Sequence, residues 1–454
     1  GKVGSKTADV DADHLIKHFG AVQHLVHEGW LAAMHDVSAG GLVTALLEMC
    51  FANTGGGINF YTDGFETVLK QTDLVRILFA ENPAVVIQVE DRFKNRVEAY
   101  LDSLGAVYFP IGAVASENVL TISHGKQNFF VSVPAMRTIW YEPSYRFDLM
   151  QTAKACADER HANFGKQPLR YTVPAAVRKA LGTKAPATPH KPSGIKAAII
   201  REKGVNGDRE MAYSLYCAGF DVKDVHMTDL ASGRETLDDV SMIVFCGGFS
   251  NSDVLGSAKG WASGFRWNET AREALRRFYS RPDTLSLGVC NGCQLMVELG
   301  LLSGGALGND IRPVEMHHNR SGKFESEFVS MKVVDDNSVM FGSLKGLTAG
   351  IWVAHGEGRF VTTDAFKASG VRVAARYAYQ GYPGNPNGSE GAVAAMCSAD
   401  GRHLALMPHL ERAIFPWQCA WCPDWMRERA FTPWLQAFTN AFAWLKKAKK
   451  AASK

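Results

Sequence analysis

The chain has 454 residues, of which 46% are hydrophobic and 21% are charged. This composition is typical of folded globular proteins and excludes the disordered and fibrous classes, while the length favours two or three domains. The net charge of +3 is small for the length, so we expect neither nucleic acid nor an anionic membrane as a partner. No apolar run is long enough to span a membrane, and no signal peptide is recognisable.

The cysteine count points to the compartment. Nine cysteines, an odd number, are scattered along the chain. Large chains with unpaired, scattered cysteines are typical of reducing compartments, so we expect free thiols and a cytoplasmic protein. The chain begins with Gly rather than Met, and we expect it to be a fragment or a processed product.

The first 150 residues are predicted to form an α/β sandwich. Apolar periodicity predicts an amphipathic helix, then alternating strands and a second helix. In chain order these are a helix over 13–28, a strand over 30–34, a helix over 42–51, and strands over 84–89, 106–109 and 119–122.

A polar turn with paired glycines separates the strand over 30–34 from the helix over 42–51. Backbone N–H groups in such a turn can hold an anion, and Asp36 is placed to ligate a cation. Alternatively, the glycines only make a tight turn, and Asp36 or Ser38 caps the helix. The pattern alone does not choose between the two.

Residues 151–193 are punctuated by prolines and predict a linker with a helix near 175–181. The second domain, over 194–454, then alternates strands and helices. This order predicts a doubly wound, mostly parallel sheet covered on both faces, in which ligands lie beyond the carboxyl ends of the strands. The predicted strands are 195–200, 220–225, 242–245 and 285–288, and the predicted helices are 208–218 and 269–279.

Cys290 stands between Gly288 and Gly292, after an apolar strand and before a helical pattern. This is the thiol counterpart of a nucleophile elbow, because the glycines allow a sharp turn that exposes the residue between them. The start of a helix also favours the reactive thiolate. A buried structural cysteine is the alternative, which the two glycines disfavour. Gly247 and Gly248 follow a neighbouring strand, where their N–H groups are natural donors for an oxyanion hole.

A cysteine nucleophile needs a histidine and a group that orients it. His409 and Glu411 follow a strand predicted over 404–407, and alternate residues of an extended chain point the same way. A surface His beside a surface Glu is the alternative. His355 has the same spacing to Glu357, but its glycine-rich surroundings favour a site-lining or structural role.

Two Cys-x-x-Cys pairs, 290/293 and 419/422, raise the alternative of a zinc site or redox pair. The first pair belongs to the elbow, and the second has no other ligand cluster nearby. We therefore do not expect zinc.

Several motifs together resemble a known family. The class I glutamine amidotransferase domain of the large phosphoribosylformylglycinamidine synthases has similar motifs, and the first unit is similar to the last portion of their synthetase region, an aminoimidazole ribonucleotide synthetase-like C-terminal domain. The motifs are Gly-Val-Cys-Asn-Gly-Cys-Gln at 288–294, Cys-Gly-Gly-Phe-Ser at 246–250, His-Gly-Glu-Gly-Arg at 355–359, Asn-Pro-Asn-Gly-Ser at 385–389, Met-Pro-His-Leu-Glu-Arg at 407–412, and His-Asp-Val-Ser-Ala-Gly-Gly-Leu at 35–42.

The resemblance implies roles for individual residues. Cys290 would attack the glutamine carboxamide and form a glutamyl thioester, with His409 and Glu411 as the other members of a triad. The oxyanion hole and glutamine pocket would be lined by Gly247, Gly248, Asn291 and Gln294. In the first unit, Asp36 would hold Mg²⁺ and Ser38 would contact ATP or ADP at an auxiliary site.

The family reaction converts formylglycinamide ribonucleotide, glutamine and ATP to formylglycinamidine ribonucleotide in purine biosynthesis. Because the family enzymes are longer, we expect the rest of the same polypeptide as a partner. The catalytic ATP site and most of the ribonucleotide site would lie upstream, so this chain would at most hydrolyse glutamine and pass on ammonia.

The sequence departs from the family pattern in two places. Asn251-Ser252-Asp253 stands where the family often has Tyr-Gly-Asp, and Leu410 replaces a proline. The first change affects a loop over the expected glutamine pocket. Another cysteine hydrolase of the same fold, or a non-catalytic scaffold, remains an alternative.

Overall fold

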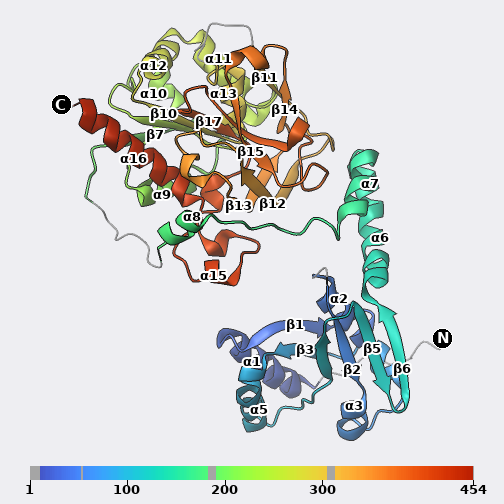
Figure 1. Ribbon diagram of the computed structural model, residues 1–454. Helices are drawn as coiled ribbons and strands as arrows, with labels where there is room; N and C mark the ends of the chain where they lie inside the picture. Colours follow the sequence, from blue (N-terminus) through green and yellow to red (C-terminus); the bar gives the residue numbers. More distant parts are fainter. Residues whose placement is uncertain (1–10, 53–54, 183–190, 304–311, 453–454) are drawn as a thin grey trace. The chain divides into compact units, whose positions relative to one another are not determined.

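The computed structural model describes residues 11–52, 55–182, 191–303 and 312–452 (Figure 1). The chain divides into two compact units, Gly1–Phe147 and Asp148–Lys454. Among the described residues, no helix combines the length and the apolar character that crossing a lipid bilayer requires.

The first unit combines helices with two small sheets. In one sheet β1 pairs antiparallel with β3, and the other has the order β4-β2-β5-β6 with β2 and β5 parallel. The elements are α1 (Ala12–His27), β1 (Leu31–Val37), α2 (Gly41–Phe51), β2 (Gly57–Tyr61), α3 (Asp63–Val68), α4 (Leu74–Phe79), β3 (Ala84–Val89), α5 (Lys94–Ser103), β4 (Gly112–Ala115), β5 (Val119–His124), β6 (Gln127–Ser132) and α6 (Val133–Gln151).

One predicted strand of this unit is wrong. Residues 106–109 form no strand, and the strand lies farther along, at β4. The Val107 N–H donates to Nε2 of His18 at 3.0 Å, and the Tyr108 hydroxyl donates to Asp102 at 2.9 Å. These side-chain partners replace the strand ladder, so the apolar run packs against helices instead.

Helix α1 forms as predicted, but its apolar stripe is not its buried face. Leu15, Phe19 and Val26 are 47%, 63% and 49% exposed, whereas Ala21 and Leu25 are buried against α5. Periodicity predicted the helix and its apolar side, but it carries no information on which residues a neighbouring element covers.

The second unit is built on one nine-stranded sheet of order β13-β12-β15-β16-β17-β10-β9-β7-β8. Its elements are α7 (Lys154–Asn163), α8 (Ala175–Ala180), β7 (Lys196–Arg201), α9 (Asp208–Ala218), β8 (Asp221–His226), α10 (Met227–Ala231), β9 (Met242–Phe245), α11 (Lys259–Trp267), α12 (Glu269–Ser280), β10 (Leu285–Val289), α13 (Asn291–Glu298), β11 (Val314–His317), β12 (Glu325–Val333), β13 (Thr348–His355), β14 (Arg359–Thr362), α14 (Phe366–Ser369), β15 (Arg372–Tyr377), β16 (Val393–Cys397), β17 (His403–Leu406), α15 (Asp424–Arg427) and α16 (Leu435–Ala452).

The doubly wound sheet that the sequence predicts is confirmed in one half of the sheet. Within this half, β17, β10, β9, β7 and β8 are parallel to one another. The other half, β13 to β16, is antiparallel. Strands β9 and β10 are buried along their whole length, as expected for central strands covered on both faces.

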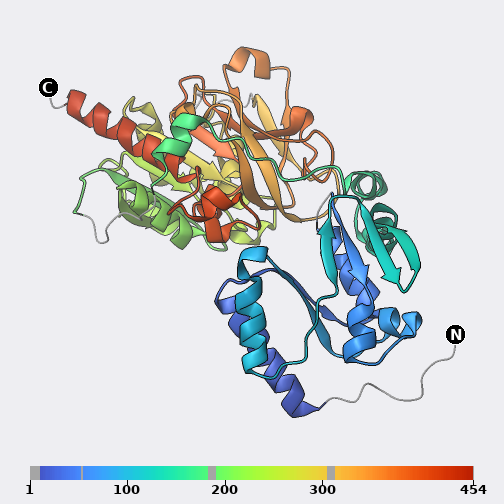
Figure 2. The same ribbon diagram turned by 60° about the horizontal axis from the view of Figure 1, so that its bottom comes forward.

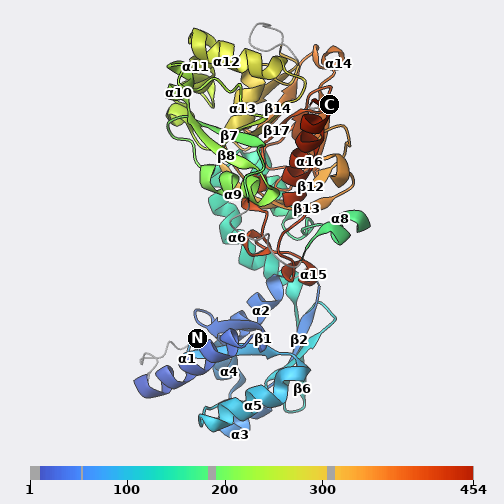
Figure 3. The ribbon, with the colours of Figure 1, turned by 90° about the vertical axis from the view of Figure 1, so that its left-hand side faces the viewer.

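Helices cover the parallel half on both faces. The C-terminal helix α16, red in Figure 2, packs against α9, which contacts β7 and β8. Helix α13 packs on β9, β10 and β17 and contacts α11, which in turn lies beside α12 (Figure 3). From β7 the chain moves to β8 at the edge of the sheet, and it then returns past β7 to β9 and β10. Because the crossovers are right-handed, this change of direction places α9 and α13 on opposite faces.

A buried charge cluster joins α7 to the antiparallel half of the sheet. Arg160 lies 3.2 Å from Asp148 and 3.5 Å from Glu325, and it also contacts Glu327. The guanidinium stacks 4.6 Å above the ring of Tyr382. Only 18% of the Arg160 side chain is exposed. The segment that the sequence predicts to be a linker therefore begins with a helix that belongs to the second unit.

We expect Arg160→Met to destabilise the second unit by about 3 kcal/mol, because Glu325 and Glu327 lose the cation beside them, whereas Asp148 keeps Lys323 at 3.2 Å. Urea unfolding monitored by tryptophan fluorescence measures this. Arg276→Met is the matched control, since Arg276 pairs with Glu273 on the surface of α12. Equal unfolding curves for the two variants would show that the cluster contributes no net stability.

Candidate functional site

The turn after β10 has the strained geometry of a nucleophile elbow. Cys290 has φ 54° and ψ −108°, and α13 begins at the next residue. A Cβ on Gly292 would lie 2.0 Å from the Phe245 carbonyl oxygen, so only glycine fits there. The Cys290 N–H donates to the Leu406 carbonyl at 2.9 Å, and its Sγ lies 3.3 Å from the Ala354 carbonyl oxygen.

The imidazole of His409 lies three residues beyond β17, the strand next to β10. Its backbone N–H donates to the Trp352 carbonyl at 2.9 Å, and its Nδ1 lies 2.6 Å from Oε1 of Glu411. Both side chains are buried, with 1% of each residue exposed. Glu411 belongs to a short 3₁₀ turn, Leu410–Arg412, rather than to the extended chain that the sequence suggests.

Gly247, two residues after β9, leaves room for Cys290 and the imidazole to lie close together. A Cβ on Gly247 would lie 2.8 Å from Cε1 of His409 and 3.2 Å from Cβ of Cys290. The carboxyl ends of three adjacent parallel strands, β9, β10 and β17, therefore bring these three residues together.

The buried His409 is strongly basic. Burial alone would lower its pKa, but the Glu411 carboxylate, with a smaller contribution from Cys290, raises the pKa to about 9. Because Nδ1 faces Glu411, Nε2 is the nitrogen that remains for the thiol. This Nε2 is buried and has no partner at hydrogen-bond distance among the described residues, although Cys290 is close enough to raise the pKa of the ring.

His355 has the opposite character. Burial, and secondarily the charge on His409, lower its pKa to about 3. Its Nε2 lies 3.3 Å from Nδ2 of Asn387, and it ends β13. A neutral, buried imidazole fits a wall of the site rather than a base.

Two backbone N–H groups, one after Gly247 and one at the start of α13, have no acceptor among the described residues. Gly248 has φ 113°, a conformation that suits glycine. In the part of the chain that the structure describes, neither the Gly248 N–H nor the Asn291 N–H donates to another group. Unpaired N–H groups at a helix start attract negative charge.

The side chains of Asn291 and Gln294 are bound within the protein. The Asn291 Oδ1 accepts from the Ser250 N–H at 3.3 Å, and its Nδ2 donates to Asp253 at 3.2 Å and to Gln294 at 3.1 Å. The Gln294 Nε2 donates to the Glu357 carbonyl at 2.8 Å. Sequence reasoning gave Asp253 and Glu357 no role, although both lie in motifs that it singled out.

The turn before α2 is open to solvent. The Asp36 side chain is 73% exposed, and Ser38 is exposed as well. Helix α2 starts after Gly40 without a side-chain cap, so the capping by Asp36 or Ser38 is wrong. The tight turn is present, since the Gly41 N–H donates to the Ser38 carbonyl at 3.0 Å. Instead, the Gly40 N–H donates to Oε1 of Glu81 at 2.9 Å.

The described residues contain no group of three or more His, Cys, Asp or Glu that could hold a metal ion, and all nine cysteines are free thiols. The alternative of a zinc site therefore finds no support in these ranges. Asp36 by itself does not fit a complete magnesium site, since it supplies one exposed carboxylate.

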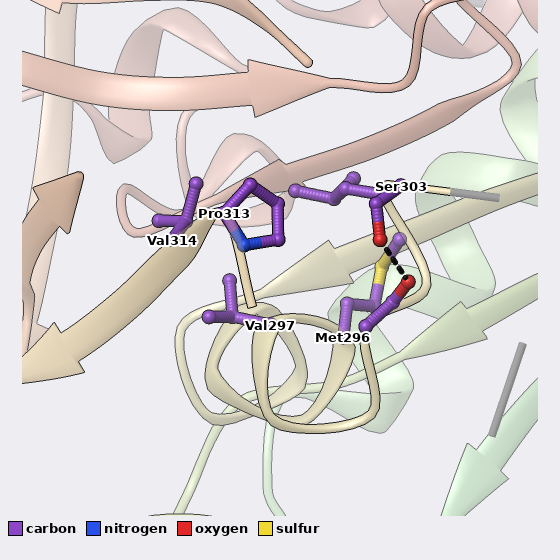
Figure 4. A pocket seen from close by; sticks show the side chains of 7 residues that line it. Met296, Val297, Ser303, Pro313 and Val314 are labelled. Carbon is purple, nitrogen blue, oxygen red and sulfur yellow. Dashed lines mark hydrogen bonds between the residues drawn. The ribbon is translucent and has the colours of Figure 1, made fainter. Parts of the chain in front are cut away.

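A small, mostly apolar pocket lies beside the end of α13 and holds none of these residues (Figure 4). The Ser303 hydroxyl donates to the Gly300 carbonyl at its edge, at 3.0 Å. The pocket is lined by Met296, Val297, Gly300, Leu302, Ser303, Pro313 and Val314.

Known proteins resemble both units. Residues 194–445 match the family described as CobB/CobQ-like glutamine amidotransferase domain, and residues 4–125 match the AIR synthase related protein, C-terminal domain. The chain is 38% identical over 98% of its length to phosphoribosylformylglycinamidine synthase of Homo sapiens, and 36% identical over 98% to a probable phosphoribosylformylglycinamidine synthase, chloroplastic/mitochondrial, of Arabidopsis thaliana.

The chain spans about a third of the length of these relatives, 34% of the first and 32% of the second. Among solved structures, one of PurLQS from Thermotoga maritima has a TM-score of 0.42 at 26% identity, covering 56% of this chain and 100% of that chain.

We expect His409 to keep its proton up to about pH 9, well above its ordinary pKa of 6.5. Because the folded pKa is raised, the charged imidazole stabilises the fold fully below about pH 6.5, and this contribution is lost as the pH rises through 9. NMR titration of ¹³C-labelled histidine measures the pKa, with the signal assigned by its loss in His409→Gln.

The Glu411→Gln variant should move this titration to lower pH, because the carboxylate is what raises the pKa. His355 is the internal control and should stay neutral over the same range. An unchanged His409 titration in Glu411→Gln would contradict the assigned cause.

Proposed function

This chain belongs, over residues 194–445, to the CobB/CobQ-like glutamine amidotransferase family, and we propose that it hydrolyses glutamine to release ammonia. The observation that carries the proposal is the meeting of Cys290, His409 and Gly247 at the carboxyl ends of three parallel strands. A strained thiol, a carboxylate-paired imidazole and free N–H donors are the three requirements of acyl transfer from an amide.

In the proposed reaction, His409 holds the proton of the Cys290 thiol, and the thiolate sulfur attacks the carboxamide carbon of glutamine. The resulting oxyanion would be stabilised by the N–H groups of Gly248 and Asn291. His409 then gives its proton to the leaving nitrogen, the C–N bond breaks, and ammonia departs. A water molecule, deprotonated by His409, attacks the glutamyl thioester and restores the thiol with release of glutamate.

Glu411 acts on the imidazole rather than on the substrate. It holds Nδ1 of His409 at 2.6 Å, which leaves Nε2 toward the thiol. It also stabilises the imidazolium that exists before ammonia leaves. Since the pair is buried, water does not weaken the interaction.

We further propose that the ammonia serves phosphoribosylformylglycinamidine synthase activity in the longer protein. The substrates would be formylglycinamide ribonucleotide, glutamine and ATP, and the rest of the polypeptide would supply the synthetase site. Similarity to synthases over 98% of the chain supports this. Free thiols favour a reducing compartment such as the cytoplasm.

For the first unit we propose that Asp36 and Ser38 contact a magnesium nucleotide. The exposure of the turn supports this, with 73% of the Asp36 side chain open to solvent. Asp36 would supply one ligand to an ion whose other ligands come from phosphates and from the longer protein. Asp36→Asn in the full-length enzyme should lower retention of ADP, measured by equilibrium dialysis in MgCl₂, by at least about tenfold. Asp91→Asn is the control, and equal retention by both variants would refute the assignment.

The glutaminase proposal is tested with Cys290→Ala and Cys217→Ala. We expect the affinity label 6-diazo-5-oxo-norleucine to modify the unsubstituted chain and Cys217→Ala at Cys290, as mapped by mass spectrometry. Cys290→Ala should escape labelling and lose glutamine hydrolysis by at least about 10³-fold, because no other thiol meets the imidazole.

Two results would point elsewhere. Turnover of peptides but not of glutamine would identify another cysteine hydrolase of this fold. A Cys290 thiol that neither label nor substrate modifies would identify a non-catalytic scaffold.

A further inference from the structure

The loop between β9 and α11 includes Gly248, and the carboxylate of Asp253 binds this loop to the residue after the thiol. We propose that Asp253, through Asn291, positions this loop so that the Gly248 N–H faces the thiol, which makes Asp253 a positioning residue for glutamine hydrolysis. The inference rests on the proposed function.

The loop does not hold its shape through its own backbone preferences. Three successive non-glycine residues, Asn251, Ser252 and Asp253, have φ values of 52°, 57° and 49°. Left-handed backbone is unfavourable for residues with a Cβ, although asparagine and aspartate tolerate it better than serine. A run of three such residues persists only when surrounding contacts hold it.

Asp253 makes contacts at both ends of the turn. One carboxylate oxygen accepts from the Ala258 N–H at 3.2 Å, and the other accepts from the Ser257 hydroxyl at 3.2 Å. Both oxygens lie within 3.3 Å of Nδ2 of Asn291. The carboxylate therefore closes the loop on itself and also ties it to the elbow helix.

Asn291 connects this carboxylate to the reacting centre. It follows Cys290 directly, and its Oδ1 accepts from the Ser250 N–H at 3.3 Å. Ser250 lies two residues after Gly248. Because one buried amide binds both Ser250 and Asp253, a shift of the loop would break its bonds and move the Gly248 N–H relative to the thiol.

A second carboxylate, in the turn between β13 and β14, supports the same arrangement. Both oxygens of Glu357 accept from the Ser257 N–H at 3.3 Å, while the Glu357 carbonyl accepts from Gln294. Gln294 in turn accepts from Asn291 at 3.1 Å. Five residues, Asp253, Asn291, Gln294, Glu357 and Ser257, thus form a closed ring of hydrogen bonds around the elbow. Asp253 is the carboxylate of this ring that lies on the loop.

The chain offers a matched control in the same loop. Val254 follows Asp253 and is 81% exposed. Its side chain lies outside the ring, so Val254→Ala changes the loop without changing its anchoring.

Asp253→Asn should separate positioning from nucleophile chemistry. Both carboxylate oxygens face the Nδ2 donor of Asn291. In the amide one of them becomes an NH₂ donor and only one oxygen still accepts, so the link is weakened. We expect kcat for glutamine hydrolysis to fall about 10- to 100-fold, which is the range for a displaced oxyanion donor. KM should change less than about threefold, because the oxyanion exists only in the transition state. Iodoacetamide, which needs no oxyanion donor, should alkylate Cys290 at the unsubstituted rate, and Val254→Ala should change none of these.

Two further measurements distinguish positioning from loss of fold. Hydrogen exchange should become at least about tenfold faster at the Ser250 and Ala258 amides in Asp253→Asn, while amides of β10 keep their protection. The double variant, Asp253→Asn with Asn291→Asp, exchanges the two groups and so restores one donor–acceptor pair. Its kcat should be higher than that of either single variant.

Unchanged kcat in Asp253→Asn, or a change confined to KM, would overturn the inference while leaving the glutaminase intact. A chain without substitutions that neither hydrolyses glutamine nor reacts with 6-diazo-5-oxo-norleucine would instead overturn the proposed function. The two failures are therefore distinguishable in one set of assays.

Discussion

The register between β10 and β17 is the constraint on which the site depends. Val289 lies opposite Leu406, and the Cys290 N–H continues the ladder to the Leu406 carbonyl. This pairing aligns the ends of two parallel strands that are more than a hundred residues apart in sequence. A slip of the register by even one residue would turn the side chains to the opposite face and separate the thiol from the imidazole that follows β17. The packing of α13 across three strands serves to hold this alignment.

The imidazole of the site belongs to a buried pair with Glu411. An isolated buried ion would be unfavourable, but here each charge has a partner. Because Glu411 lies two residues from His409, bringing the two side chains together needs little additional ordering of the chain. The neighbouring His355 is neutral, because a second imidazolium would have neither solvent nor a carboxylate beside it. His355 therefore adds no charge beside the thiol. Oε1 of Glu411 lies 2.6 Å from Nδ1 of His409 and 4.0 Å from Nε of Arg412, so the imidazole is its nearer partner.

The sequence predicted the parts of this arrangement that depend on local chemistry. Gly-x-Cys-x-Gly after an apolar run and His-x-Glu after another are short patterns, and helix 208–218 and strand 242–245 match α9 and β9. The antiparallel half of the sheet was not predicted, since its strands pair over long separations and carry mixed patterns. The ring through Asp253 was also missed, because each of its bonds joins residues that are distant in sequence or lie in an irregular loop. A run of left-handed residues without glycine has no compositional signal.

The exposed stripe of α1 has a practical consequence. Leu15, Ile16 and Phe19 present contiguous apolar side chains to water in the first unit, with Ile16 68% exposed. Strongly hydrated salts such as ammonium sulfate favour the burial of such surface. The purified chain should therefore precipitate at lower ammonium sulfate concentrations than globular proteins of similar size whose helices bury their apolar side. Low-salt buffers with glycerol suit its handling.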